Sequence, residues 1–115
     1  FPALLETIHK GEAVPPSTPE KILALLHQLL KTKYSHGDFH ARNLLVDDEG
    51  TPNLIDLDGV KKHLTSPGIT RYIRNDRDRF LRSLEPIPER HQEFSSVLGE
   101  PGSPLPEKLP THDKR

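Results

Sequence analysis

The feature that most constrains the fold is a strongly amphipathic stretch in the first third of the chain. Its aliphatic residues recur at intervals of three or four positions: Ile22, Leu25, Leu26, Leu29 and Leu30. Such a stripe forms the buried face of a helix. Thr18 and Pro19 supply a cap and a first-turn proline. The pattern predicts a helix over residues 19–32 that packs against the rest of the domain.

Two short β-type runs follow this helix and predict a β-hairpin. The runs cover residues 44–46 and 53–55, and the acidic segment between them ends in Gly50. Acidic turn residues followed by glycine, between two such runs, are typical of a hairpin. We therefore expect residues 47–49 to form a solvated turn, because the twelve-residue pattern of a calcium loop is absent.

Apolar residues at helical spacing also occur before and after this central region. Residues 1–9 are predicted to form a short helix, and residues 73–84 a longer one with Asn75 as its cap. After residue 85, proline, glycine, serine and charged residues dominate, with few apolar anchors. This composition predicts a folded part over residues 1–85 and a disordered, proline-rich tail over residues 86–115. The alternative for the tail is a polyproline ligand.

Composition excludes several classes of function. The chain has 115 residues, a formal net charge of −1 and no cysteine. The charge argues against a strongly basic nucleic-acid binder, and the missing cysteine excludes disulfides, thiol nucleophiles and cysteine zinc sites. No apolar run approaches the ~20 residues that a membrane-spanning helix needs. Because methionine is also absent, we expect the sequence to be a fragment of a longer protein.

Polar side chains gather around the predicted hairpin, and their types indicate phosphoryl transfer. Asp38, Asn43, Asp56 and Asp58 flank its two strands, where we expect them to face a cleft. Carboxylate and carboxamide oxygens are the ligands that Mg²⁺ prefers in proteins. A further carboxylate beside such a site could orient or deprotonate an attacking hydroxyl.

The spacing of these residues matches a known catalytic loop. His36, Asp38 and Asn43 stand at i, i+2 and i+7, as in the protein-kinase catalytic loop, and Asp56 follows where kinases carry their metal-binding aspartate. Residues 1–85 therefore resemble part of a kinase-like C-terminal lobe. The segment His-Gly-Asp-Phe-His-Ala-Arg-Asn-Leu-Leu-Val, with the later Leu-Ile-Asp-Leu-Asp-Gly-Val, is most similar to the bacterial lipopolysaccharide core kinases. That family phosphorylates heptose or 3-deoxy-D-manno-octulosonic acid.

The resemblance implies a fold and a role for each residue. The fold would be α+β and mainly helical, with a small catalytic hairpin, a catalytic loop over 36–43 and a metal-binding motif over 56–59. Asp38 would be the catalytic aspartate, while Asn43 and Asp56 would hold Mg²⁺ against the phosphates of ATP. Asp58 stands in place of the motif's glycine and would assist the metal or brace the loop. His36 and His40 would support the loop.

The resemblance also implies an enzyme. We expect an ATP-dependent phosphotransferase (a kinase) that acts on a sugar hydroxyl of the lipopolysaccharide core, in the cytoplasm and in peripheral contact with the inner membrane. Its partners would be ATP and the acceptor sugar, with no nucleic acid. Nothing before His36 resembles the Gly-rich loop and strand lysine that hold ATP, so we expect the chain alone to be inactive. The alternatives are another atypical small-molecule or protein kinase, or a non-catalytic binding fragment.

Simpler interpretations stay open at this point. Asp38, Asn43 and Asp56 could be ordinary turn and cap residues. His36 and His40, which flank Asp38, could form a transition-metal cluster with it. Residues 71–82 contain five arginines, which form either a solvated face paired with neighbouring aspartates or a patch for an anionic substrate or membrane surface. These arginines are Arg71, Arg74, Arg77, Arg79 and Arg82.

Overall fold

Helices and short strands alternate along the chain in the computed structural model, which describes residues 3–107. The elements in chain order are α1 (Leu4–His9), α2 (Thr18–Thr32), β1 (Tyr34–Ser35), the 3₁₀ turn η1 (Ala41–Asn43), β2 (Leu44–Val46), β3 (Pro52–Leu54), the 3₁₀ turn η2 (Leu57–Gly59), β4 (Lys61–Lys62), α3 (Ser66–Arg82) and α4 (Pro88–Leu98). The strands form two antiparallel pairs, β1 with β4 and β2 with β3. The predicted α+β class is confirmed.

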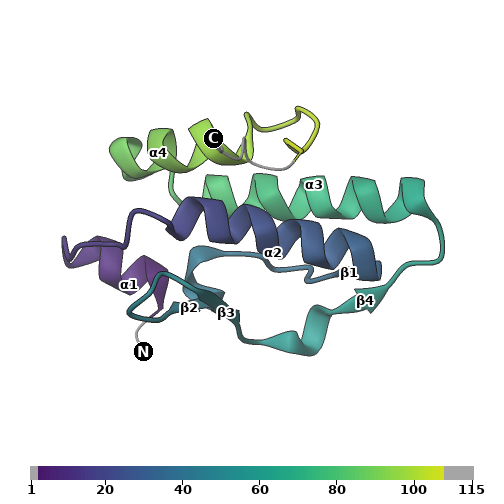
Figure 1. The fold of residues 1–115 in the computed structure, drawn as a ribbon, viewed down its shortest axis with the longest axis horizontal. Helices are drawn as coiled ribbons and strands as arrows, with labels where there is room; N and C mark the ends of the chain where they lie inside the picture. The colour runs from purple at the N-terminus through teal and green to yellow at the C-terminus, as the bar shows by residue number, and fades with distance from the viewer. Residues whose placement is uncertain (1–2, 108–115) are drawn as a thin grey trace, which may run out of the picture.

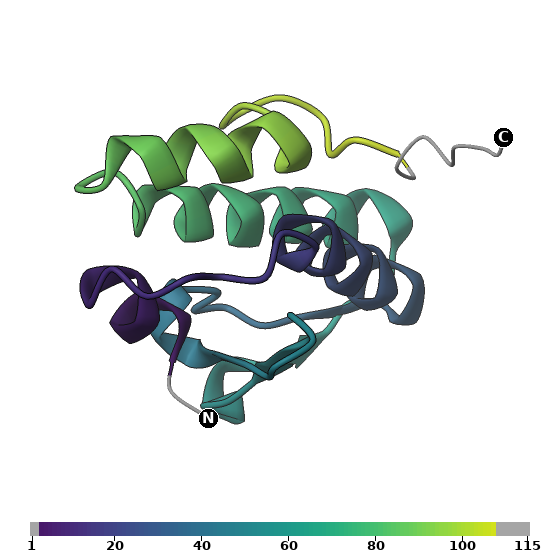
Figure 2. The same cartoon turned by 60° about the vertical axis from the view of Figure 1, so that its left-hand side comes forward.

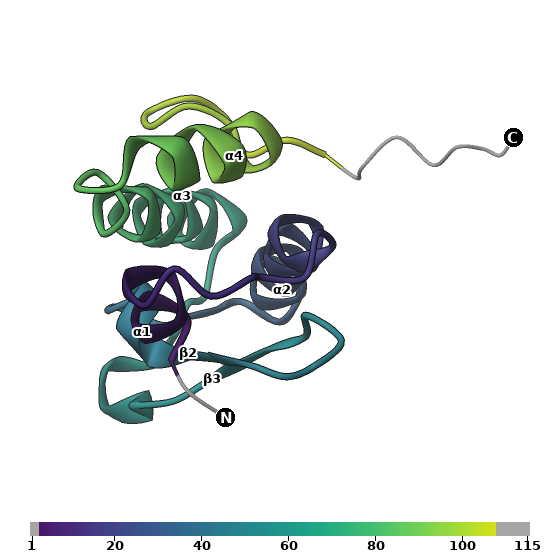
Figure 3. The same ribbon diagram turned by 90° about the vertical axis from the view of Figure 1, so that its left-hand side faces the viewer.

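Helices α2, α3 and α4 form one side of the molecule, and the strands with α1 form the other (Figure 3). α3 and α4 lie side by side, and α2 packs against both (Figures 1 and 3). α1 packs on η1 and β2 at the opposite end from β4 (Figure 1). After α4 the chain loops beside that helix (Figure 2), and hydrogen bonds from Arg74 and Arg77 hold this segment to α3. Within residues 3–107 no helix is long and apolar enough to cross a bilayer.

The predicted central helix is confirmed as α2. Ile22 and Leu26 of the predicted stripe are fully buried, and the other stripe leucines are partly buried against the core. Leu23, which lies outside the predicted stripe, is buried as well. The prediction that Thr18 caps this helix was wrong. Helix α2 starts at Thr18 itself, Ser17 makes no side-chain cap bond, and Thr18 Oγ1 is buried without a hydrogen-bond partner among the described residues.

The predicted hairpin is confirmed as β2 and β3, with the second strand one residue earlier than expected. Its turn is held by Asp47, whose Oδ1 accepts the backbone N–H groups of Glu49 and Thr51 at 2.9 Å each. Gly50 has φ +85°, which a residue with a side chain rarely adopts. Asp48 and Glu49 are exposed, as expected for a solvated turn.

Helix α3 starts seven residues earlier than predicted, and Asn75 is not its cap. Asn75 lies in the middle of the helix, while Thr65 is the N-cap and its Oγ1 accepts the N–H of Gly68 at 3.1 Å. Pro67 occupies the first turn, where its missing N–H costs nothing. The first turns contribute the buried Ile69 to the core. Packing of this residue stabilises the start of the helix, where apolar residues are too few for the sequence pattern to predict it.

The segment after residue 85 differs from the expected disorder, because α4 folds onto the core. Phe94 and Leu98 are fully buried one turn apart, and the Phe94 ring packs edge-on against Phe80 at 5.4 Å between centroids. The fully buried guanidinium of Arg77 donates to the carbonyls of Leu98 and Ser103. Two apolar anchors and one buried arginine therefore fix this segment. The rest of the predicted tail, 108–115, lies outside the described residues.

Candidate catalytic loop

The segment 36–43 runs from β1 to β2 beneath α3 and is anchored by apolar side chains. Phe39 and Ala41 are fully buried, and Phe39 packs edge-on against Phe80 of α3 at 5.8 Å. The N–H of Ala41 also donates to Ser83 Oγ at 3.3 Å. Burial of Phe39 holds the loop against α3, so that the neighbouring Asp38 is turned toward solvent and is about a third exposed.

The buried His36 ring bonds to two backbone groups of the site. Its Nδ1 accepts the N–H of Asp38 at 3.2 Å, and its Nε2 lies 2.9 Å from the carbonyl oxygen of Ile55. A carbonyl only accepts, so the ring is the neutral tautomer with its proton on Nε2. His36 thereby ties the loop of residues 36–43 to the residue before Asp56.

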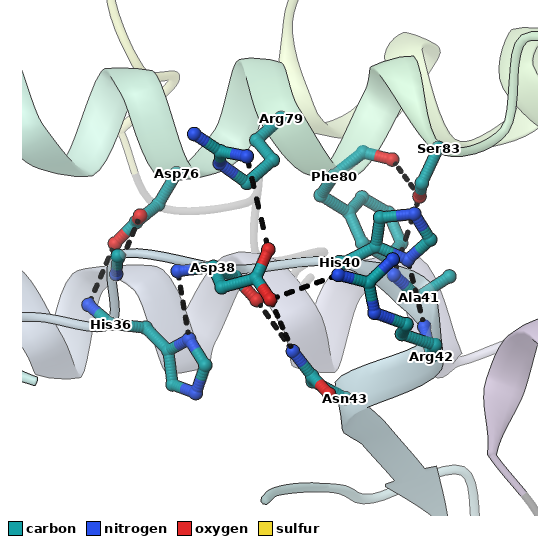
Figure 4. A network of polar contacts seen from close by, with 11 residues as sticks. His36, Asp38, His40, Ala41, Arg42, Asn43, Asp76, Arg79, Phe80 and Ser83 are labelled. Atoms are coloured by element: carbon teal, nitrogen blue, oxygen red, sulfur yellow. Dashed lines mark hydrogen bonds and ion pairs between the residues drawn. The ribbon is translucent and has the colours of Figure 1, made fainter. Parts of the chain in front are cut away.

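The buried Asp76 of α3 holds the start of the same loop. Its Oδ2 accepts the N–H of His36 at 2.9 Å and its Oδ1 accepts the N–H of Gly37 at 3.2 Å (Figure 4). Burial raises the pKa of Asp76 above the ordinary aspartate value, although the two N–H donors oppose that shift. Both carboxylate oxygens are therefore committed to the backbone of the loop.

This role of Asp76 was not predicted from the sequence. One of the two interpretations of the arginines in residues 71–82 was a solvated face paired with neighbouring aspartates, and that interpretation is wrong for Asp76 and Arg77, which are both buried. A signal was present, because Asp76 continues the apolar stripe of Ile69 and Ile73 at helical spacing. An acidic residue within such a stripe needs a buried partner.

Asp38 lies between two arginines. Its Oδ2 is 3.1 Å from Arg42 Nη2 and 3.2 Å from Asn43 Nδ2, and its Oδ1 is 3.8 Å from Arg79 Nη1 (Figure 4). Burial by itself raises the pKa of Asp38. The charge of Arg42 and the hydrogen bonds from Arg42 and Asn43, with the charge of Arg79, outweigh burial and hold the pKa below its ordinary value. Asp38 is thus a carboxylate at neutral pH, and Oδ1 is its less engaged oxygen.

Asn43 and His40 complete the loop. Asn43 is buried and donates through Nδ2 to Asp38, both to the backbone carbonyl at 2.9 Å and to Oδ2. His40 caps η1, where its Nδ1 accepts the N–H of Arg42 at 3.1 Å. Burial lowers the pKa of His40, and the charges of Arg42 and Arg79 add to that effect against the opposing charge of Asp38. A neutral ring is what the cap requires.

The structure brings the predicted metal-site residues together only in part. Asp38 and Asn43 are in direct contact, and the N–H of Ile55 donates to the Asn43 carbonyl at 2.9 Å, which places Asp56 next to the loop. Asp56 is exposed, in the left-handed region at φ +60°, and Asp58 is exposed within η2. Neither carboxylate has a hydrogen bond to Asp38 or Asn43 within the part of the chain that the structure describes.

The alternative of a transition-metal cluster is wrong. Over residues 3–107, no three histidine, aspartate or glutamate side chains lie close enough together to hold a metal ion. Both ring nitrogens of His36 and the Nδ1 of His40 are occupied by backbone groups. The same finding means that Asp38, Asp56 and Asp58 do not form a three-carboxylate cluster among the described residues either. Two of the predicted magnesium ligands keep unbonded oxygens. No described hydrogen bond engages Asn43 Oδ1 or the Asp56 carboxylate, and magnesium commonly takes one or two protein oxygens with water and phosphate oxygens.

Comparison of the chain with models of protein families and with curated protein sequences finds no match. The functional assignment therefore depends on the residues of the loop and on their geometry.

Proposed function

We propose that this chain carries the catalytic loop of an ATP-dependent phosphotransferase of the protein-kinase-like type. The observation that carries the proposal is the contact between Asp38 and Asn43, five positions apart on a loop braced by His36 and followed by a hairpin that leads to Asp56. Ordinary turn residues do not explain why a buried asparagine bonds the partly exposed Asp38 carboxylate while a buried histidine bonds the backbone N–H of the same residue.

Asp38 is the acceptor-facing group in this proposal. As the hydroxyl oxygen of the acceptor forms its bond to the γ-phosphorus of ATP, the bond from that phosphorus to the β-bridging oxygen breaks and ADP leaves. Asp38 Oδ1 orients the hydroxyl and takes up its proton. The low pKa that Arg42 imposes keeps Asp38 ionised before the reaction and makes it a weak base, so orientation is its larger contribution.

Asn43 Oδ1 and the Asp56 carboxylate are the groups that would hold Mg²⁺. When bound, the ion neutralises charge on the β- and γ-phosphates. The hydrogen bonds from Asn43 Nδ2 to Asp38 fix the carboxamide, so that its oxygen points away from Asp38. The backbone bond from Ile55 to Asn43 holds the residue before Asp56 against the loop.

The resemblance of the loop to lipopolysaccharide core kinases favours a sugar hydroxyl as acceptor and the cytoplasmic face of the inner membrane as the location. The other members of the same superfamily, which act on small molecules or on protein serine and threonine, use the same loop. A non-catalytic fragment of such a kinase would bind nucleotide without turnover.

The test is magnesium-dependent ATP binding to the chain, measured by calorimetry. Binding is measured in place of turnover, because we expect no turnover from this chain alone. Gly11 is the only glycine before His36, so this part of the sequence holds no Gly-rich phosphate loop. Asp56→Asn should abolish the magnesium-dependent part of the binding, and Asp48→Asn, in the exposed turn, is the matched control. ATP binding that needs no magnesium, or that survives Asp56→Asn, would contradict the proposal. Where turnover is measurable, Asp38→Asn should lower it by about 10²–10⁴-fold.

A further inference from the structure

A cavity of about 320 Å³ lies beside the catalytic loop, between the β1–β4 pair and α3. This volume is at the small end of the range for ligand sites. The residues that matter for its chemistry are Gly37, Gly59, Lys61, Tyr72, Asn75 and Arg79. No role for this cavity follows from the loop motif.

Backbone forms the floor of this cavity. Gly37 has φ +91°, and a Cβ built on it would lie 2.9 Å from the carbonyl oxygen of Gly59. The two segments therefore touch without side chains between them, and a side chain at either glycine would fill the space. The carboxylate of Asp76 lies at the cavity wall, but its two oxygens accept the N–H groups of His36 and Gly37.

Two cationic side chains line the cavity from opposite elements. Lys61 enters from β4 and Arg79 from α3. No ion pair or side-chain hydrogen bond among residues 3–107 engages the amino group of Lys61. The next residue, Lys62, points elsewhere, since its Nζ donates to the carbonyl of Thr32 at 3.1 Å and lies over the Tyr34 ring. Strand alternation thus directs Lys61 alone to the cavity.

Arg79 connects the cavity to the catalytic aspartate. Its Nη1 is 3.8 Å from Asp38 Oδ1 (Figure 4), and over residues 3–107 no other group pairs with or hydrogen-bonds its guanidinium. A ligand bound by Arg79 would therefore lie close to Asp38. An oxyanion is the group that two converging cations bind best.

The geometry points to this cavity as the subsite for an anionic group, a carboxylate or a phosphate, on the acceptor. This inference rests on the proposed phosphotransferase function and narrows its substrate class to small hydroxylated oxyanions. A larger hollow of about 700 Å³ beside the N-terminal half of α3 is a poorer candidate. Two of its charged side chains are already bonded within the protein, because Arg74 donates to the Gly102 carbonyl and Asp78 accepts from Arg77 and Gly102.

The test is a titration of the isotope-labelled chain, followed by NMR, with three sugars that differ in charge. Glucuronate and glucose 6-phosphate should produce saturable shifts at the amides of Lys61, Tyr72 and Asn75, and neutral glucose should not. The tighter of the two anionic sugars identifies carboxylate or phosphate as the preferred group. Lys61→Met should weaken that binding by about tenfold, because it removes one charge-assisted contact. Lys62→Met, the matched control on the same strand, should leave the affinity unchanged.

Three results would overturn the subsite. They are shifts with glucose equal to those with the anionic sugars, no shifts with either anionic sugar, or an affinity that Lys61→Met leaves unchanged. Adding magnesium and ATP to the same samples separates this inference from the proposed function. Competition between ATP and the sugar at the Lys61 amide would make the cavity a nucleotide-phosphate site and overturn its assignment to the acceptor. Loss of the sugar response with intact nucleotide binding would refute the subsite and leave the phosphotransferase proposal standing.

Discussion

Removal of the Asp76 carboxylate gives the sharpest test of how the candidate catalytic loop, residues 36–43, is held. In Asp76→Ala, the N–H groups of His36 and Gly37 lose the acceptors that lie 2.9 and 3.2 Å away. A buried donor left without a partner costs about 1–3 kcal/mol, which applies in full to His36 and only in part to Gly37, whose bond is part-buried, so the two together cost about 2–5 kcal/mol. Part of this is offset, because the variant no longer pays for burying the carboxylate whose pKa burial raises. We therefore expect a loss of about 2–4 kcal/mol in the free energy of unfolding.

The assay is urea unfolding followed by circular dichroism, with NMR of the His36 and Gly37 amides. A loss of 2–4 kcal/mol corresponds to a fall of roughly 10–20 °C in Tm for a domain of about 100 residues. Asn75→Ala, at the exposed neighbouring position, is the matched control and should change stability by less than about 0.5 kcal/mol. An Asp76→Ala variant as stable as the control, with unchanged His36 and Gly37 amide signals, would refute the view that Asp76 holds the loop.

Three further predictions follow from individual contacts. Arg77→Met should lower the free energy of unfolding by about 3–5 kcal/mol in urea titrations, because it removes a buried charge together with its bonds to Leu98 and Ser103. Gly37→Ala should cost more than Gly11→Ala in thermal unfolding. Both have positive φ, which costs about 1–3 kcal/mol, but only the new Cβ at Gly37 meets backbone. His40 has a lowered pKa in the folded chain, so the unfolded chain binds the extra proton first and stability should fall as pH drops below about 6.5. His40→Asn keeps the cap acceptor and should flatten that part of a pH series of unfolding curves; an unchanged slope would contradict the assignment.

The elements that the sequence predicts correctly are those with a local cause. α2 follows from the spacing of its leucines, and the β2–β3 hairpin follows from an acidic turn that ends in Gly50. The contact of Asp38 with Asn43 is also local, since the two are five positions apart on one loop. Each of these features can be predicted from residues that are close together in the sequence.

The features that could not be predicted from the sequence depend on contacts between distant segments. α4 has few apolar residues and is fixed by Phe80 and Arg77, which lie about 14 and 21 positions before the groups they touch. The role of Asp76 requires the loop that starts 40 positions earlier. The distance between Asp58 and the loop, expected to be short, depends on the path of η2, which no periodicity in the sequence specifies.

The bond between Asp76 and the start of the loop also determines when the site can form. Residues 36 and 76 are 40 positions apart, so the loop lacks its carboxylate partner until α3 has been synthesised and docked. Chains are made from the N-terminus at about 5–20 residues per second, which leaves the loop incomplete for seconds during synthesis. Closing a segment of this length also carries an entropic cost that only the later helix repays. The hairpin and α2 can form early, but the geometry around Asp38 is a late event in folding.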